Sequence, residues 1–433
     1  MAINDLTESY LNSIIFNDEP SNIQDILPLI DNPFVNRKTN DALSMLFHRF
    51  YKNTDIPLGI PVFSFYSYLS AFCLLNRATM KIPKTRKNTE LDTWIMLLAP
   101  SGASKSLSND LISNLIPLDF HGNKVVEPNI AKPNGPVGMI KQLAAIPEKR
   151  GFWIEDEAAQ MFKGIEQVVG PMSEMRDYLL KLKEGQKIER LTSKEHITIK
   201  DFRMTQLFIN TIDSMANTLT EQSMHDGLFR RYQVAIATKD DERPIEDHAL
   251  YNLSNVIDDT VEEAFNSLFS QNIFENNYTF EEGCEEVYSV CFKHFWLKQY
   301  KKFMSNDESK YRTYMMESWK YAVFNHILHK RAGTVISCED LQYGLKVAMY
   351  LLNSLQHFVK FRARTLEIKL PAKKDKLQQI MDFIRSMENS KDFGCRSVQR
   401  KFNIKKDEVI LILNSIRTHQ PEFKTKLFSI LEK

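Results

Sequence analysis

A lysine and a serine, Lys105 and Ser106, follow a loop of small residues and begin a segment with helical spacing. The apolar run before the loop, residues 94–99, has the composition of a buried strand. Successive backbone N–H groups in such a loop can wrap phosphate oxygens, the positive end of the helix dipole favours the same anion, and the lysine reaches the outer phosphates. The order strand, loop and helix therefore predicts a phosphate-binding site, in which Ser106 would hold Mg²⁺.

This loop matches the P-loop pattern GxxxxGK[ST] only in part. Ala99 and Ser104 stand at its two glycine positions, although Gly102 lies inside the loop. A Cβ atom at Ser104 would crowd the phosphates. The alternative is an ordinary turn between a strand and a helix that ends in a solvated lysine. The residues predicted to bind the nucleotide are Ser101, Gly102, Ala103, Ser104, Lys105 and Ser106.

Two acids, Asp156 and Glu157, end a second apolar run that begins at Phe152. A buried parallel strand presents carboxylates in this way at its carboxyl end. Next to a phosphate-binding loop, Asp156 would bind Mg²⁺ through water and Glu157 would polarise the attacking water. The alternative is a helix that begins here, whose first acids interact favourably with the helix dipole.

Two further polar pairs follow along the chain. Asn210 and Thr211 close another apolar strand, where either side chain would sense the outermost phosphate or the attacking water; the alternative is a strand end that caps the next helix. Arg230 and Arg231 follow a glycine turn and precede an apolar strand. Arginine stabilises charge on a transferring phosphoryl group, often across a subunit boundary.

The spacing of apolar residues divides the chain around these motifs. Residues 1–90 have helical spacing and many aromatic residues, which core packing explains better than base stacking. Residues 91–245 carry the strands and the candidate site residues. Residues 246–370 predict long helices that form a bundle or lid.

A hairpin is predicted for residues 187–203, where apolar and polar residues alternate. Lys187 and Arg190 would contact single-stranded DNA if a strand threads a ring of subunits. A solvated hairpin face has the same composition.

Positive charge is concentrated in residues 360–433, which carry eighteen Lys and Arg against nine Asp and Glu in a chain of net charge +1. Such clustering is typical of a nucleic-acid-binding segment, and a solvated helical face is the alternative. Residues 371–433 predict three helices and a short last segment at 424–431, the pattern of a winged helix that binds DNA or docks a protein. The phosphate contacts predicted for it are Arg396, Arg400, Lys401, Lys405 and Lys406.

The composition, 433 residues with 43% hydrophobic and 26% charged, is that of a globular protein. The sequence has no run of eighteen apolar residues and no basic, apolar leader, so we expect a cytoplasmic protein with no membrane partner. The cysteines are scattered and include no CxxC pair, which argues against a disulfide framework and a structural zinc site. They are Cys73, Cys284, Cys291, Cys338 and Cys395.

The order of these motifs resembles the P-loop ATPases that form the helicase half of phage and plasmid primase–helicases and of RepA-like replication proteins. The resemblance covers roughly residues 40–360 and includes the segments IPLGIPVFSFYSYLSAFCLL, LLKLKEGQKIERLTSKEHITI and HDGLFRRYQVA. It implies that Lys105 and Ser106 belong to Walker A and that Asp156 and Glu157 belong to Walker B. It also implies that Asn210 is the sensor and that Arg230 or Arg231 is a trans-acting finger.

The resemblance also implies an α/β P-loop NTPase core, RecA- or AAA+-like with a mostly parallel sheet, flanked by helical regions and followed by a small winged-helix domain. The implied cofactors are ATP and Mg²⁺. The implied partners are single-stranded or origin DNA, other copies of the chain in a homo-hexamer, and a primase or initiator protein. The expected activity is that of an ATP-dependent replicative helicase of a phage, plasmid or other mobile element.

Two other functions stay open. The departures at Ala99 and Ser104 favour a non-hydrolysing DNA-binding initiator or helicase-loading adaptor, which kept the fold while its P-loop decayed. A P-loop ATPase of phage defence has the same sequence features as the replication protein.

Overall fold

The computed structural model describes residues 41–369 and 380–414, except residues 168–169, 171, 192–195, 221–222, 225–226, 239–242, 298–307, 381, 385, 388–393, 403, 407–408 and 411. The chain divides into two compact units, one that ends at Lys360 and one that begins at Phe361. The predicted boundaries at residues 91 and 246 lie inside the first unit, and the boundary at residue 371 lies inside the second.

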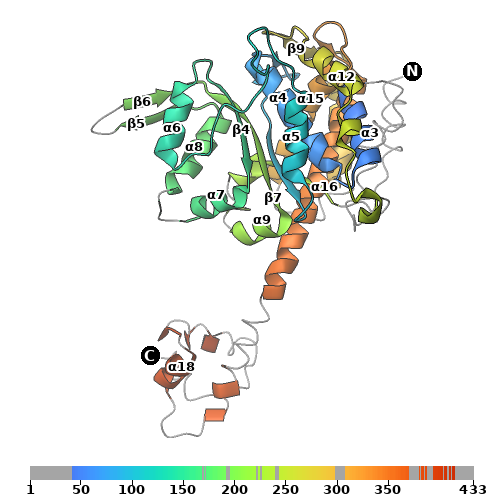
Figure 1. Cartoon of the computed structure of the whole chain (residues 1–433). Helices are drawn as coiled ribbons and strands as arrows, with labels where there is room; N and C mark the ends of the chain where they lie inside the picture. Colours follow the sequence, from blue (N-terminus) through green and yellow to red (C-terminus); the bar gives the residue numbers. More distant parts are fainter. Residues whose placement is uncertain are drawn as a thin grey trace. The chain divides into compact units, whose positions relative to one another are not determined.

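A four-stranded sheet in the first unit consists of β3 (Trp94–Ala99), β4 (Arg150–Asp156), β7 (Arg203–Thr211) and β8 (Gln233–Ile236). Its strand order is β4–β7–β3–β8, and every pairing is parallel (Figure 1). Strand β3 is buried along its whole length, as expected for a parallel strand with helices on both faces. The sheet agrees with the predicted α/β core.

The register brings the carboxyl ends of three strands to one edge of this sheet. Ala99 at the end of β3 is opposite Thr211 at the end of β7, and Asp156 at the end of β4 is opposite Ile209. Strand β7 lies between the other two. We call this edge the carboxyl edge and the opposite one the amino edge.

Helices cover both faces of the parallel sheet. Helices α6, α7 and α8 lie on one side of it, and α4 and α5 lie on the other (Figure 1). These helices and the one that follows β7 are α4 (Gly59–Leu75), α5 (Lys105–Leu115), α6 (Pro136–Ala145), α7 (Ala158–Ile165), α8 (Ser173–Lys183) and α9 (Ile212–Thr218).

Helix α4 is a central helix. All its residues except the last are buried, because its sequence is apolar on every face. The Ser70 hydroxyl donates to Leu91 O at 2.8 Å and lies 2.8 Å from the Thr205 hydroxyl. The N–H of Thr93 donates to the same Ser70 oxygen at 3.0 Å. The helix is therefore bonded to the starts of β3 and β7.

Two smaller sheets accompany the parallel one. The predicted hairpin is present as β5 (Ile188–Leu191) and β6 (His196–Ile199), paired antiparallel. The other sheet has the order β10–β9–β1–β2. Its strands lie in connections between the expected helices, and the sequence did not predict them because strands this short show no period. Its strands are β1 (Thr79–Met80), β2 (Thr89–Glu90), β9 (Asn277–Phe280) and β10 (Val335–Ile336).

Helices dominate the remainder of the first unit, as predicted. The first of these helical segments, residues 253–269, is divided into two helices, because Asp258 caps the second one by accepting from Val261 N–H at 3.0 Å. A cap also begins the last long helix, where Asp340 N–H donates to the Ser337 hydroxyl at 3.2 Å. These helices are α3 (Ala42–Asn53), α11 (Leu253–Val256), α12 (Asp259–Phe269), α13 (Cys284–Phe295), α15 (Glu308–Leu328) and α16 (Cys338–Lys369).

The second unit has a small apolar core that includes Val398 on α18 (Cys395–Phe402). The core residues that are fully buried are Ile380, Ile384, Val398, Val409 and Leu413. The predicted helix at residues 395–402 is present, whereas the predicted last segment at 424–431 lies outside the described residues.

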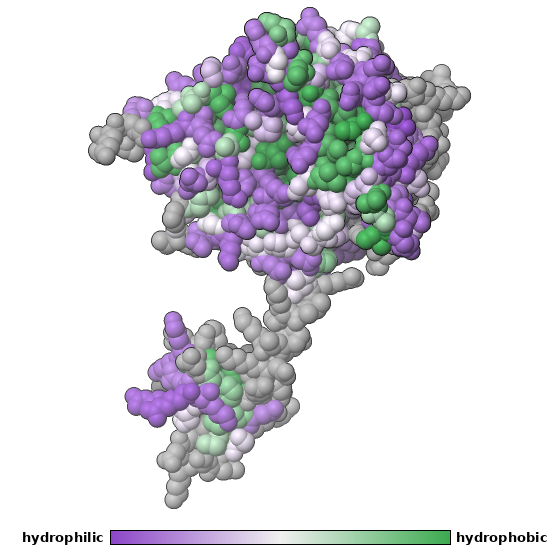
Figure 2. All heavy atoms as spheres, viewed as in Figure 1, coloured by the Kyte–Doolittle hydropathy of each residue, from purple (hydrophilic) through white to green (hydrophobic). Residues whose placement is uncertain are grey.

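Hydrophilic and hydrophobic residues are mixed on the face of the first unit that Figure 2 shows. Within the described part of the chain, no helix is both long enough and apolar enough to cross a membrane.

Candidate functional site

The loop between β3 and α5 passes twice through left-handed backbone. Gly102 has a φ of 74°, and Ser104 has a φ of 51° and a ψ of 38°. The second glycine of the P-loop pattern thus falls where this backbone needs a positive φ, and here a serine adopts it. Left-handed backbone costs a non-glycine residue roughly 1–2 kcal/mol. The departure from the pattern at Ser104 therefore carries backbone strain.

The amino end of α5 is open to an anion. Ser104 occupies the cap position but makes no side-chain capping bond, and the first turn contains no acid. The first N–H groups of a helix have no partner within the helix and carry its positive dipole end. These donors are therefore left for a phosphate oxygen.

The lysine of the loop lies close to the acid at the end of β4. Lys105 Nζ donates to Pro100 O at 3.0 Å, so the side chain folds back over the loop. Burial lowers the pKa of Lys105, and the charge of Asp156 opposes that shift. The ammonium group is thus near enough to Asp156 to interact with its charge.

A hydrogen bond joins the loop to that same acid. Ser106 Oγ donates to Asp156 Oδ2 at 2.6 Å, across 50 residues of sequence. The other carboxylate oxygen, Oδ1, accepts from Glu157 N–H at 2.9 Å. A hydroxyl and a carboxylate are oxygen ligands of the kind that Mg²⁺ prefers. The structure therefore brings together the two residues predicted to hold the metal.

Glu157 forms a tight turn between β4 and α7. Its φ of 57° is left-handed, and non-glycine residues in such conformations concentrate at functional sites. The side chain is exposed, and Gln160 Nε2 donates to its Oε2 at 3.2 Å. Its carboxylate is available to a water molecule.

Asn210 and Thr211 have different environments. Thr211 caps α9 by accepting from Ser214 N–H at 3.2 Å, which is the alternative that the sequence left open. Asn210 is buried next to Leu98 of β3, and its Oδ1 accepts from Thr211 N–H at 2.7 Å. Its buried Nδ2 has no hydrogen-bond partner among the described residues. A buried donor of this kind requires an explanation, and a ligand at the carboxyl edge supplies one.

No protein-family model matches this chain. No curated protein proves similar to it either. The function is therefore inferred from the geometry of the site.

Two residues that lie beside the loop were not predicted from the sequence. The Tyr251 hydroxyl donates to Asp55 and interacts with the Ser104 side chain. Burial is the main cause that raises the pKa of Tyr251. Asp55 and Tyr251 come from segments about 200 residues apart, so only the folded chain shows that they form a wall of the loop.

The two arginines lie away from the loop of their own chain. They end the short 3₁₀ turn Phe229–Arg231, just before β8 begins, and therefore at the amino edge of the sheet. Arg231 pairs with Glu184 and donates to Gly227 O. The structure thus does not bring Arg230 and Arg231 to the other predicted site residues within one chain.

The predicted DNA contacts of the hairpin are paired within the chain. Lys187 Nζ lies 2.6 Å from Glu189 Oε2, and Arg190 pairs with Glu174 and donates to the Tyr178 hydroxyl at 3.0 Å. The hairpin tip lies outside the described residues.

Basic residues of the second unit lie on α18 and just beyond it. Arg396, Arg400 and Lys401 belong to the helix, and Lys405 and Lys406 follow it. Lys401 Nζ lies 4.0 Å from the centre of the Phe383 ring, a cation–π contact that holds this amine near the core.

Proposed function

We propose that the first unit is a P-loop ATPase, and that the chain is an ATP-dependent replicative DNA helicase of a phage, plasmid or other mobile element. The observation that carries the proposal is the 2.6 Å hydrogen bond from Ser106 to Asp156. It joins the residue after the loop lysine to the acid at the end of β4. Strand β7 lies between β4 and the strand that leads into the loop. An ordinary solvated turn gives no reason for this contact.

The carboxyl edge fits ATP and Mg²⁺. The open amino end of α5 and the unpaired Asn210 Nδ2 offer donors to phosphate oxygens, and Lys105 offers a positive charge. Ser106 and Asp156 would hold Mg²⁺, and the amides of residues 101–106 would hold the phosphates. When bound, the metal would neutralise charge on the phosphates.

The chain's own residues then have distinct roles. Lys105 would draw negative charge toward the loop, as the phosphoryl group moves. Glu157 would orient the attacking water and accept its proton at a carboxylate oxygen. Asn210 Nδ2 would donate to that water or to the outermost phosphate.

The strand order supports a RecA- or AAA+-like version of the fold. Strand β7, which carries Asn210, lies between the strand that leads into the loop and the strand that ends in the acids. A polar side chain at the end of β7 is therefore beside both halves of the site.

The positions of the arginines favour a ring. Arg230 and Arg231 are at the amino edge, so they would act on the ATP of a neighbouring subunit, as in a homo-hexamer. The second unit would be a winged helix that contacts DNA through its basic residues, and single-stranded DNA would pass along the hairpin. A cytoplasmic primase or initiator protein would be a further partner.

A non-hydrolysing initiator or helicase-loading adaptor is the second candidate. One observation favours it, the left-handed strain at Ser104 in the position of the second P-loop glycine. Such a protein would bind nucleotide without turning it over.

The first experiment compares Lys105→Ala with Lys87→Ala, which removes an exposed lysine from a surface loop. We expect single-stranded DNA to stimulate phosphate release by the wild type and by Lys87→Ala. The rate of phosphate release by Lys105→Ala should be at least about 100-fold lower. Phosphate release by Lys105→Ala at the wild-type rate would remove the loop from the mechanism.

A nucleotide titration with and without Mg²⁺ separates the two candidates. The helicase proposal expects Mg²⁺ to tighten ATP binding through Ser106 and Asp156, and expects release of phosphate to follow. Tight binding without release, with or without DNA, would favour the adaptor.

A further inference from the structure

Two strand-to-helix corners in the first unit have the same design. Strand β9 leads into α13, which begins at Cys284, and β10 leads into α16, which begins at Cys338. The two strands pair in parallel, with Ile336 opposite Phe280. The two cysteines therefore lie side by side although 54 residues separate them in the sequence.

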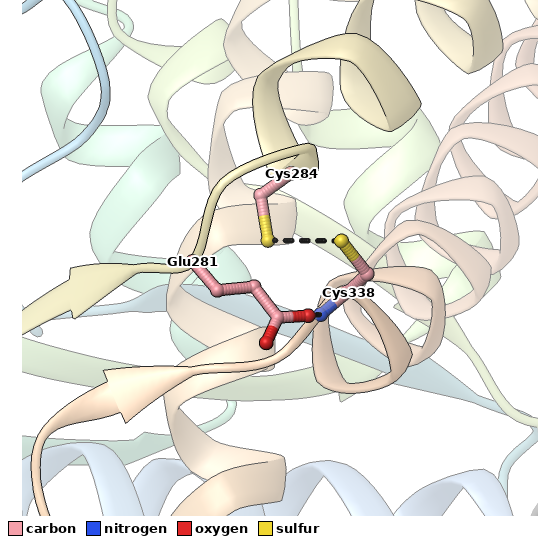
Figure 3. Close-up of side chains that lie close together, drawn as sticks. All are labelled: Glu281, Cys284 and Cys338. Carbon is pink, nitrogen blue, oxygen red and sulfur yellow. Dashed lines mark hydrogen bonds between the residues drawn. The ribbon is translucent and has the colours of Figure 1, made fainter. Parts of the chain in front are cut away.

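Figure 3 shows three side chains that converge between the two helix starts. The Sγ atoms of Cys284 and Cys338 are 3.5 Å apart. The third side chain is Glu281, whose Oε1 accepts from Cys338 N–H at 2.6 Å. One ligand atom from each residue lies within 4.8 Å of the other two.

The distance between the sulfurs fits a shared metal ion better than a disulfide. A disulfide requires about 2.05 Å between the sulfur atoms. Two thiolates that each lie about 2.3 Å from a tetrahedral zinc ion are about 3.8 Å apart. The observed 3.5 Å is close to the second value.

The two helix starts favour negatively charged ligands, which a cation can hold together. Zinc displaces thiol protons, and the positive dipole ends of α13 and α16 favour the thiolates that result. The nearby charge of Arg331, which interacts with Glu281, offsets the excess negative charge of this ligand set.

Exposure differs across the cluster in a way that suits metal entry. Cys284 is buried, Cys338 is half-buried and Glu281 is exposed, so the carboxylate side faces solvent. Water can therefore complete a tetrahedral site. Thiolates select zinc over Mg²⁺ and Ca²⁺, which prefer oxygen.

We propose that Cys284, Cys338 and Glu281 bind one zinc ion, with water as the fourth ligand, and that this ion joins α13 to α16. The site shares no residue with the proposed ATP site and does not depend on the proposed function. It reverses the sequence-based argument against a structural zinc site, which considered the spacing along the chain and could not include the pairing of β9 with β10.

The test uses the full chain after chelation and reduction, titrated with zinc alone against a chromophoric competitor. We expect one ion per chain. Cys284→Ser and Cys338→Ser should each weaken binding at least about 100-fold, and Glu281→Gln about 10- to 100-fold, by comparison with the loss of metal-site partners in general. Cys395→Ser is the matched control and should bind as the wild type does. Lys105→Ala should also bind normally, which separates this proposal from the ATPase.

A measurement on the wild type guards against cysteine variants that fail to fold. Zinc should slow the alkylation of the half-buried Cys338, mapped by mass spectrometry, and leave that of Cys395 unchanged. No zinc binding by the reduced wild type, or zinc binding as tight as the wild type's in both cysteine variants, would overturn the proposal. A Cys284–Cys338 disulfide that forms in air, in a chain that binds no zinc when reduced, would also overturn it in favour of a redox pair.

Discussion

Both edges of the parallel sheet carry buried polar groups, and at the amino edge these groups include a cluster of paired charges. At the amino edge, Asp92 Oδ2 lies 3.0 Å from Lys183 Nζ, and its Oδ1 lies 3.6 Å from Lys320 Nζ. Lys320 Nζ lies 3.1 Å from Glu317 Oε2, which also accepts from Gln233 Nε2 at 2.9 Å. Each charge in this cluster, the amino-edge cluster, therefore has a partner.

At the carboxyl edge, one buried side-chain amide lacks the partners that the amino-edge cluster has. Asn210 Nδ2 is buried without a partner among the described residues, and Ser104 is held in a strained conformation. A fully paired buried network favours a unique packing, whereas unpaired donors and backbone strain concentrate at functional sites. We therefore expect the amino-edge cluster to stabilise the sheet and the carboxyl edge to bind a ligand.

The largest effect is expected at the amino edge. Asp92→Ala leaves Lys183 and Lys320 buried without their shared carboxylate, and breaking a buried pair in this way costs about 3–5 kcal/mol of unfolding free energy. Chemical denaturation measures the loss. Asp177→Ala is the control, because it removes an exposed partner of Lys181 and should cost only about 0.3–0.5 kcal/mol. Equal losses in the two variants would contradict the structural role of the amino-edge cluster.

A second substitution tests the carboxyl edge. Asn210→Ala removes a donor from the proposed site, so ATP hydrolysis should fall about 10²- to 10³-fold. The unfolding free energy should fall by only about 0.5–1.5 kcal/mol, because the Nδ2 group has no partner to lose and only the bond from Thr211 N–H to Oδ1 is removed.

The control for Asn210 lies on the same strand. Gln206 is a buried amide whose Oε1 accepts from the Tyr232 hydroxyl at 2.7 Å. Gln206→Ala should lower the unfolding free energy by about 1–3 kcal/mol, since a buried hydroxyl loses its partner. A larger stability loss from Asn210→Ala than from Gln206→Ala would show that both edges are structural.

The pH dependence of stability gives a third test. Burial alone would raise the pKa of Asp92, but Lys183, Lys320 and Arg203 lower it to about 2. A carboxyl pKa that is lower in the folded state stabilises the fold above about pH 4 and loses that contribution as the pH falls toward 2. The lowered pKa of Asp92 contributes about 2 kcal/mol to the unfolding free energy at neutral pH. The difference in unfolding free energy between the wild type and Asp92→Asn should therefore shrink as the pH falls from 5 to 3. A constant difference would contradict the lowered pKa of Asp92.

The smallest effect concerns Ser104. Ser104→Gly relieves left-handed strain of roughly 1–2 kcal/mol but adds disorder to the unfolded chain, so the unfolding free energy should rise by up to about 1 kcal/mol. Removing the Cβ atom should also tighten nucleotide binding. Ser101→Gly is the control, because Ser101 has no positive φ and glycine there should destabilise by about 0.5–1 kcal/mol. Destabilisation by both glycines would show that Ser104 is unstrained.

Local patterns in the sequence predicted the elements around the site well. The apolar run at residues 94–99 predicts the strand that is present as β3, because an uninterrupted apolar run is a local signal. The apolar spacing of residues 136–145, with Pro136 at its start, likewise predicts the helix that is present as α6. The separate roles of Asn210 and Thr211 could not be predicted. They depend on where β7 ends against β3, which is a contact between distant segments.

Contacts between distant segments also account for what the sequence did not indicate. The pairing of Cys284 with Cys338 depends on two short strands, and the charges around Asp92 come from α8 and α15. The place of Arg231 at the amino edge is set by the start of β8 and by Glu184. No local pattern in the sequence indicates which residues these side chains contact.

The burial of α4 has a practical consequence for dissecting the chain. A fragment excised at the predicted boundary, residues 91–245, would lose the packing of α4 on β3, β4 and β7 and would leave the Thr205 hydroxyl without Ser70. Such a piece should aggregate on expression, whatever its loop does with nucleotide. A fragment that keeps this sheet folded has to start ahead of Gly59.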